Sequence, residues 1–419
     1  MDKLFIKRLE IRKVRHLNNI TIPLSEDQMK HLILTGKNGS GKTSVVEALA
    51  GYLANTLEDQ FFTDKEQWLI NDKRQWDMAI QNQKDEAEIA KYEKKFCECE
   101  RDFHQSRKGL DIKFNIKTQD IYSLKDAKHY IVAYYKADRV FHAVQPKHVE
   151  KVQLRDYYSL TEYPRNEFVK YLLDLKMTEA LAARNNNKTE KANEIQTWFS
   201  KLEQLLKRIF DDETVKLEFD EETFEFRILQ HGKEPFDFNT LSSGYQAVLD
   251  IVLDIMMRMQ NQTHHSFGFN LPGIVIIDEI ETHLHLELQK NIMLLLTTIF
   301  PNIQFIVTSH SPFILNSIGD AVIYDLENHT LVEDGLNDVP YDGVVEGYFR
   351  VDKLTDTLKE KFEKYKNLAA KNKLSDDELS EIAELEMYLD EIPDYLAIGF
   401  ATEYKRIKLE FMNREDIDG

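Results

Sequence analysis

The stretch Gly36-Lys37-Asn38-Gly39-Ser40-Gly41-Lys42-Thr43 decides the fold of this chain of 419 residues. It fits the pattern GxxxxGK followed by Ser or Thr, a loop whose backbone N–H groups cradle phosphates where a strand leads into a helix. The sequence supplies that context, because residues 31–35 form an apolar run before the loop and residues 44–57 carry apolar side chains at helical spacing after it. The stretch therefore predicts an α/β fold that binds a phosphorylated ligand at a helix N-terminus.

Three more stretches follow the loop, and their order matters as much as their composition. Leu241-Ser242-Ser243-Gly244-Tyr245-Gln246 is a polar turn ahead of a predicted helix. Gly273-Ile274-Val275-Ile276-Ile277-Asp278-Glu279 is an apolar strand that ends in two acids, and Val307-Thr308-Ser309-His310-Ser311-Pro312 is a second strand that ends in a histidine. Buried strands that alternate with helices predict a parallel sheet, which binds its ligands at the carboxyl ends of the strands.

The composition limits the classes of protein to which the chain can belong. With 42% hydrophobic and 30% charged residues, it can build one large or two ordinary domains. A net charge of −19 argues against a surface that binds DNA all over, although a local basic groove stays open. No segment approaches the ~20 apolar residues of a membrane span, and the first residues do not resemble a signal peptide. We therefore expect a cytoplasmic protein with no membrane partner.

Hydrophobic periodicity predicts strands and helices around long charged insertions. Strands are expected at 5–11, 20–23, 31–35, 110–116, 130–135, 216–219, 224–229, 274–277, 304–307 and 321–325. Helices are expected at 44–57, within 58–108, from 167 to 210 with a break at 185–187, and at 247–259, 287–299, 353–370 and 376–388. The predicted fold class is α/β, a mixed or parallel sheet covered by helices, with helical insertions and a C-terminal helical region.

The glycine-rich loop carries the chemistry that a nucleoside triphosphate needs, which is backbone N–H groups, a cation and a metal ion. The ammonium group of Lys42 is expected near the β- and γ-phosphates, and the Thr43 hydroxyl is expected on Mg²⁺. The residues predicted to bind the nucleotide here are Gly36, Asn38, Gly39, Ser40, Gly41, Lys42, Thr43 and Ser44. ATP and Mg²⁺ are the predicted cofactors.

The two acids after the buried strand have separate predicted roles. Asp278 is expected to hold Mg²⁺, directly or through a water molecule. Glu279 is expected to orient or deprotonate the water that attacks the γ-phosphate, which makes it a predicted catalytic residue.

Together the four stretches resemble the ABC-type ATPases. The resemblance implies that residues 241–246 are the signature loop, which completes the ATP site of a second subunit, so that a head-to-head homodimer holds two composite sites. It implies that Ser242, Ser243 and Gly244 contact the partner's nucleotide, and that His310 is a catalytic switch histidine at the γ-phosphate. The loop departs from the common Leu-Ser-Gly-Gly-Gln at Ser243 and Tyr245.

Within the ABC-type ATPases, the chain resembles the RecF, SMC and OLD-like group. The resemblance rests on Leu9-Glu10-Ile11 and Val14-Arg15, on Thr35-Gly36-Lys37-Asn38-Gly39, on His283-Leu284-His285, and on residues 308–312. We expect four segments: 1–57 with the phosphate loop, 58–240 with a helical lid or arm, 241–345 from the signature loop to the switch histidine, and 346–419 as a helical region. An apolar stripe in that last region (Leu358, Phe362, Tyr365, Leu368) can either pack on the ATPase head or dock a partner.

Two further assignments rest on position alone. Gln145 is the candidate glutamine-loop residue and metal ligand, with Asp138 and Arg139 as competitors. Arg15 is the candidate contact to the base or ribose of the nucleotide, and a surface arginine is the alternative.

Small ATPases of this build resemble the ATPase subunits of the antiphage systems Septu, PARIS and some retrons, which pair an ABC ATPase with a separate nuclease. The resemblance implies a nucleotide-driven switch that controls a nuclease or toxin effector. Homodimerisation through the ATP sites is expected, and a higher homo-oligomer is left open. The alternative is a RecF-like repair or recombination ATPase that DNA stimulates, so a DNA partner is left open too. A transporter subunit fits less well, because the insertions are large and no membrane domain is present.

Overall fold

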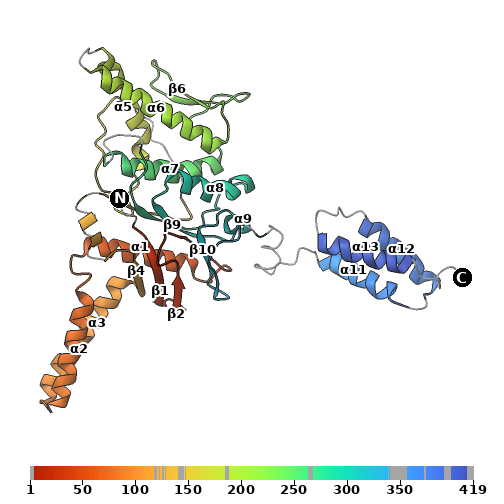
Figure 1. The fold of residues 1–419 in the computed structure, drawn as a ribbon, viewed down its shortest axis with the longest axis horizontal. Coiled ribbons are helices and arrows are strands. Elements are labelled where there is room, and N and C mark those ends of the chain that lie inside the picture. Colours follow the sequence, from red (N-terminus) through yellow and green to blue (C-terminus); the bar gives the residue numbers. More distant parts are fainter. Residues whose placement is uncertain are drawn as a thin grey trace. The chain divides into compact units, whose positions relative to one another are not determined.

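The computed structural model describes residues 4–117, 120–121, 123–124, 127, 129–139, 146, 148–184, 188–262, 268–337, 339, 356–371, 374–390 and 398–412. Its contacts divide the chain into two compact units, Met1–Val339 and Pro340–Gly419 (Figure 1). In the described part of the chain, none of the helices combines the length and the apolar character that crossing a bilayer requires.

The centre of the first unit is a six-stranded sheet with the strand order β11-β10-β3-β9-β8-β5. Its strands are β3 (His31–Thr35), β5 (Ile131–Tyr135), β8 (Gly273–Ile277), β9 (Ile303–Thr308), β10 (Ala321–Asp325) and β11 (Thr330–Val332). Neighbouring strands run parallel except for β11, which pairs antiparallel with β10. The residues of β3, β5, β8, β9 and β10 are all buried, as expected for a parallel sheet covered on both faces. The predicted α/β class is confirmed.

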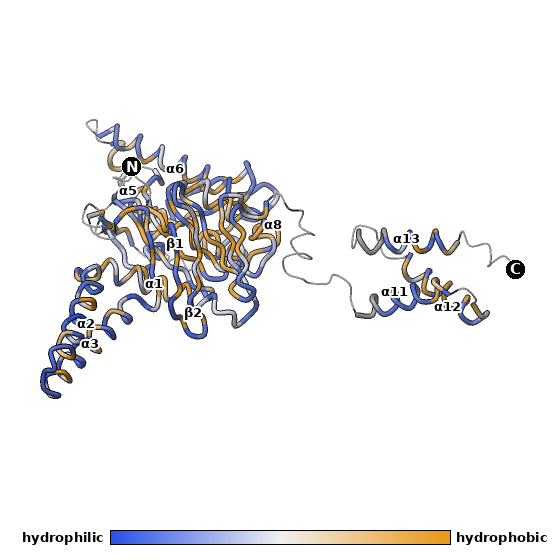
Figure 2. Tube along the Cα trace, turned by 60° about the horizontal axis from the view of Figure 1, so that its bottom comes forward, coloured by the Kyte–Doolittle hydropathy of each residue, from blue (hydrophilic) through white to orange (hydrophobic). Residues whose placement is uncertain are grey.

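Helices cover the two faces of this sheet. Side chains along a strand alternate between faces, so Tyr134 packs in the core with α1 (Lys42–Glu58), while Tyr135 donates a hydrogen bond to Asp254 of α7 (Ser243–Gln260). Figure 1 shows α7 and α8 (Leu286–Ile299) on one side of the sheet and α1 on the other. The short helix α9 (Pro312–Leu315) follows β9. The hydropathy colours show that apolar residues are concentrated in the central sheet and the helices that cover it (Figure 2).

A second sheet packs beside the first. It contains β1 (Ile6–Val14), β2 (Leu17–Pro23) and β4 (Leu110–Phe114) in the order β2-β1-β4, all antiparallel. Gln304 of β9 joins the sheets, because its amide accepts from Ile6 N at 2.7 Å and donates to Ile6 O at 3.0 Å. This pairing brings the β1–β2 hairpin next to the phosphate loop.

The predicted helical insertion is a helical hairpin of α2 (Lys65–Gln81) and α3 (Glu86–Arg107). Trp76 and Phe96 stack between the two helices with ring centroids 5.5 Å apart, and Lys95 pairs with Asp72 at 2.6 Å. Figure 1 shows this arm extending from the sheets, and hydrophilic residues predominate along its trace in Figure 2. The short arm inferred from the charged sequence is therefore present.

The second inserted region lies on the α7 side of the central sheet (Figure 1). It contains the 3-10 helix η1 (Pro164–Glu167), α5 (Phe168–Ala183), α6 (Thr189–Phe210) and the hairpin β6 (Lys216–Phe219) and β7 (Phe226–Leu229). The predicted break at 185–187 lies outside the described residues. Strand β7 begins two residues later than predicted, because Phe224 sits in the turn with a φ of 60°.

The second unit has a hydrophobic core of its own. It contains α11 (Asp356–Ala369), α12 (Asp376–Asp390) and α13 (Ile398–Met412), and α13 was not predicted. Phe362, Tyr365 and Leu368 of the apolar stripe pack against apolar residues of α12 and α13. Both earlier interpretations of this stripe are therefore wrong for these three side chains, which form the core of their own unit.

Candidate functional site

The phosphate loop spans from the end of β3 to the first residue of α1. A Cβ atom on Gly36 would lie 2.8 Å from Ser40 Oγ, and Gly36 has a φ of 131°, so this position requires glycine. Helix α1 has no side-chain cap and no acid in its first turn, which leaves the N-terminal N–H groups open to an anion. Ser40 Oγ is buried and has no hydrogen-bond partner among the described residues, as suits a hydroxyl that meets a phosphate.

The β1–β2 hairpin imposes a second constraint on the loop. Gly41 has a φ of 100°, and a Cβ atom there would lie 2.8 Å from Leu17 Cδ1 and 3.3 Å from His16 Cε1. Gly39 has a φ of 86°, but a Cβ atom there would meet nothing within 4 Å. The two glycines therefore share the backbone strain and differ in the steric contact.

This difference predicts that Gly41→Ala destabilises the protein more than Gly39→Ala. Both variants incur about 1–2 kcal/mol of left-handed backbone strain. Gly41→Ala adds about 1–3 kcal/mol because Leu17 must move. Thermal unfolding without nucleotide measures the difference, and equal melting temperatures for the two variants would show that the hairpin does not press on the loop.

Lys42 holds its ammonium group over the loop. Its Nζ donates to Gly36 O at 2.8 Å and to Lys37 O at 3.1 Å, and the side chain is buried. Burial lowers the pKa of Lys42, while the charges of Glu279, Glu281, Asp278 and Asp325 oppose that shift. The lysine therefore lies within the field of four acids.

Strand register brings three strand ends to one edge of the sheet. Leu34 of β3 pairs with Thr308 of β9, and Val307 pairs with Ile277 of β8. The phosphate loop, Thr308 and Asp278 therefore follow one another across neighbouring parallel strands. This is the edge at which open α/β sheets bind ligands.

Thr308 fixes the two predicted acids. Its hydroxyl donates to Asp278 Oδ1 at 2.6 Å and accepts from Glu279 N at 2.7 Å. Asp278 is buried, and Glu279 is half-buried with a φ of 45°, a left-handed conformation that costs a residue with a side chain about 1–2 kcal/mol. The threonine thus holds the strained turn that bears Glu279.

His310 lies at the end of β9, next to the acid turn. Its backbone N donates to Glu281 Oε1 at 2.5 Å, and the histidine is half-buried. Glu281 Oε2 is buried with no hydrogen-bond partner among the described residues. Glu281, two residues after Glu279, therefore ties the acid turn to the histidine that sequence reasoning singled out.

Sequence reasoning missed Thr308, Glu281 and Asp325 as members of this site. Asp325 ends β10, and its Oδ1 would lie 3.2 Å from a Cβ atom on Gly36. Thr308 carried a usable signal, since it is the first polar residue after the apolar run of its strand. Asp325 carried the same signal at the end of a predicted strand.

The residues predicted as the signature loop lie at the start of α7. The helix begins at Ser243, four residues earlier than predicted, since Ser242 and Ser243 are typical of helix starts rather than of a separate turn. Both serines are exposed and Gly244 is buried, with its α-carbon side facing His283 O and Leu288. Because α7 and α1 cover opposite faces of the sheet, the structure does not bring 242–244 to the phosphate loop of the same chain (Figure 1).

Tyr245 also has a defined environment. Its ring lies 4.6 Å from that of Phe210, centroid to centroid, and it is half-buried. The tyrosine that departs from the common signature sequence therefore packs against the end of α6.

A cavity of about 500 Å³ adjoins the phosphate loop. It is lined by residues of the β1–β2 hairpin, of the loop and of the β10–β11 turn: His16, Leu17, Asn18, Ile20, Lys37, Asn38, Ser40, Leu326, Glu327 and His329. Arg15 is exposed in the hairpin turn with a φ of 52°, next to His16 but not in the cavity wall. The cavity is large enough for part of a small ligand, and its position beside Ser40 suits a base or sugar.

The predicted glutamine loop is only partly described. Gln145 lies outside the described residues. Asp138 and Arg139 follow β5, and Arg139 is buried with its guanidinium group against the backbone of the acid turn. The described residues contain no cluster of three or more His, Cys, Asp or Glu side chains suited to a metal ion.

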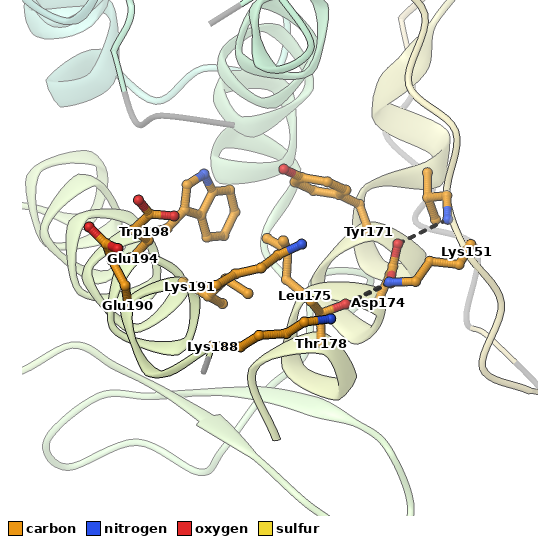
Figure 3. Close-up of a pocket in the computed structure, with 12 residues that line it drawn as sticks. Lys151, Tyr171, Asp174, Leu175, Thr178, Lys188, Glu190, Lys191, Glu194 and Trp198 are labelled. Atoms are coloured by element: carbon orange, nitrogen blue, oxygen red, sulfur yellow. Dashed lines mark hydrogen bonds and ion pairs between the residues drawn. The ribbon is translucent and has the colours of Figure 1, made fainter. Parts of the chain in front are cut away.

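A larger cavity of about 630 Å³ lies between α5 and α6, away from the predicted site residues (Figure 3). Tyr171 and Trp198 form part of its wall, and Lys151 pairs with the buried Asp174 at its edge. Lysines and glutamates both line it, so its charge does not select one class of ligand.

Three comparisons with known proteins bear on this site. A protein-family profile described as "AAA domain, putative AbiEii toxin, Type IV TA system" matches residues 112–316. The Septu protein PtuA of Bacillus mycoides (strain KBAB4) is 25% identical over 326 residues, which cover 76% of this chain and 40% of that protein. The Retron Ec83 probable ATPase of Escherichia coli is 35% identical over 147 residues, which cover 33% of this chain and 26% of that protein. The chain thus spans less than half the length of these two relatives.

Among solved structures, the SMC head bound to the C-winged helix domain of ScpA has a TM-score of 0.38 and 14% identity, and the match covers 80% of this chain and 100% of that chain. The sequence matches support the predicted resemblance to ABC-like ATPases of the antiphage-defence type. The retron relative is described by its name as a probable ATPase.

Proposed function

We propose that the chain is the ATP-binding and hydrolysing sensor and switch subunit of a bacterial antiphage defence complex, and that it controls a separate nuclease or toxin. One observation carries the ATPase part of this proposal. The phosphate loop, the acid turn that Thr308 holds and the His310–Glu281 contact lie at one edge of one sheet. The resemblance to Septu and retron ATPases supports the defence part.

The phosphate loop and α1 bind the triphosphate. The N–H groups at the start of α1 and the Lys42 ammonium group stabilise the β- and γ-phosphate charge. Mg²⁺, when bound, would neutralise negative charge on the triphosphate. The exposed Thr43 hydroxyl and the Asp278 carboxylate suit it, because Mg²⁺ takes one or two protein ligands and fills its other positions with phosphate and water.

Glu279 acts on the attacking water. Its carboxylate orients the water or takes its proton, while the strained turn fixes its direction. His310 contacts the γ-phosphate or the same water, and Glu281 positions its backbone. Burial lowers the pKa of Lys42, and the charges of the neighbouring acids oppose that shift.

A second copy of the chain completes each ATP site. Ser242, Ser243 and Gly244 begin α7 on the other face of the sheet, so they suit a nucleotide held by a partner rather than by their own chain. The Ser242 side chain does not cap its own helix, and α7 has no acid in its first turn. A γ-phosphate that both copies bind shifts the population toward a closed homodimer. Hydrolysis removes this shared contact, so the dimer opens.

Phage challenge tests the proposed function. In the native host, Lys42→Met is expected to raise phage plating to the level of a deletion strain, because the variant binds ATP more weakly and lacks the cation at the γ-phosphate. Lys290→Met is the control, since Lys290 is exposed and its nearest acid, Glu287, is 4.0 Å away. Equal plating on wild-type and deletion strains contradicts the defence role, and DNA-damage sensitivity of the deletion strain alone would favour the repair function.

The effector is tested by capture. Tagged Glu279→Gln protein, isolated in ATP and Mg²⁺, is expected to retain a nuclease or toxin in stoichiometric amount. Capture of recombination proteins instead would contradict control of an effector.

A further inference from the structure

Arg139 is a buried arginine that lies against the acid turn. It follows β5, is 7% exposed, and donates from Nη1 to Asp278 O at 3.0 Å and from Nη2 to Ile280 O at 3.0 Å. Both terminal nitrogens also lie 3.4 Å from Glu279 O. One guanidinium group therefore binds three consecutive carbonyl groups.

Three consecutive carbonyl groups converge on one donor only when the backbone leaves the extended form. Glu279, the middle residue, has the φ of 45° that produces this turn. Thr308 holds the same turn from the other side, through Glu279 N. Arg139 and Thr308 thus clamp the carbonyl and the N–H sides of the residue that bears the proposed catalytic carboxylate.

The charge of Arg139 is balanced partly by α7. Burial lowers the pKa of Arg139, and the charges of Asp250, Glu281 and Asp278 oppose that shift, with Asp250 the largest of the three. Asp250 is fully buried in α7 and forms an ion pair with Arg165. It lies about two helical turns from Ser243, the first residue of α7.

We propose that Arg139 is a positioning residue for ATP hydrolysis, which holds the backbone of residues 278–280 so that Glu279 faces the attacking water. This inference rests on the proposed role of Glu279. It assigns Arg139 no contact with the nucleotide. It therefore predicts an effect on turnover without an effect on ATP affinity.

Arg258 offers a matched control for Arg139. It is 2% exposed, pairs with Asp254 at 2.7 Å, and its Nη1 donates to Val132 O at 3.1 Å and to Tyr158 O at 3.2 Å. Both arginines are buried beside the central sheet and bind backbone carbonyl groups. Of the two, Arg139 is the one that binds the acid turn.

The first test compares Arg139→Gln, Arg139→Lys and Arg258→Lys in the full chain. Arg139→Gln is expected to lower kcat by roughly 10²-fold, the effect of misplacing a catalytic group by about 1 Å, while the Kd for ATP stays unchanged. Arg139→Lys is expected to recover part of kcat, because an ammonium group can still bind one or two of the carbonyl groups. Arg258→Lys is expected to lower the melting temperature but leave kcat of the folded protein near the wild-type value.

The kcat values of the wild-type protein and of the Glu279→Gln variant are measured in the same assay. If Glu279→Gln hydrolyses ATP at the wild-type rate, the proposed catalytic role of Glu279 fails. If Glu279→Gln is inactive but Arg139→Gln turns over normally, or if Arg139→Gln weakens ATP binding as much as it lowers kcat, the positioning role alone is overturned. Should Arg139→Gln fail to fold, the same comparison with Arg139→Lys decides.

Discussion

Glu279→Gln is expected to lower kcat for ATP hydrolysis by roughly 10²–10⁴-fold, the range for loss of a general base, while ATP binding persists. The amide keeps the shape of the carboxylate but cannot take a proton from water. The turn that presents residue 279 is held through its backbone, by Thr308 Oγ1 and by the Arg139 guanidinium group, so the substitution leaves those hydrogen bonds in place. The rate of phosphate release at saturating ATP gives kcat, and equilibrium dialysis gives the Kd for ATP.

Glu287→Gln is the matched control for this substitution. Its side chain is 80% exposed in the first turn of α8, outside the acid turn. We expect its kcat to equal that of the wild type. A Glu279→Gln protein that turns over within about threefold of wild type would remove Glu279 from the mechanism, since a loss that small is well below the range for general-base catalysis.

Lys42→Met is expected to weaken ATP binding by about 10- to 100-fold, because a hydrogen bond to a charged group contributes about 1.5–3 kcal/mol. The methionine keeps most of the buried stem of the lysine but removes the ammonium group that bonds to Gly36 O and Lys37 O. It also leaves Asp278, Glu279, Glu281 and Asp325 without the nearest loop cation, so the acids repel the phosphates. Isothermal titration with Mg·ATP measures the change.

The control for Lys42→Met is Lys290→Met, which removes an exposed lysine of α8. It is expected to bind ATP like the wild type. Unchanged ATP affinity in Lys42→Met would mean that residues 36–43 do not hold the triphosphate.

The sequence predicted the parts of the site that local pattern encodes. A glycine-rich loop between an apolar run and a helical run has few structural solutions, so β3, the loop and α1 could be placed from residues 31–57 alone. The strands before Asp278 and His310 were found for the same reason, since buried parallel strands are continuous apolar runs.

The parts that sequence could not predict depend on strand order. Arg139 and Asp278 meet because β5 pairs with β8, and no local pattern links residues that lie 139 positions apart. Thr308 and Glu281 acquire their roles only once β9 lies between β3 and β8. The stripe on α11 was assigned to the head or to a partner because α13, which covers it, was not predicted.

Each ATP site is proposed to be built from two chains, and mixing two inactive variants tests this sharing most directly. Lys42→Met removes the phosphate-loop cation, and Ser242→Arg places a bulky cation at the start of α7. Each variant alone is predicted to be nearly inactive, whereas an equal mixture should regain about a quarter of the wild-type rate, because half of the dimers in a symmetric exchange carry one intact site of two. A Ser242→Arg protein as active as wild type, or a mixture as inactive as its components, would contradict the shared site.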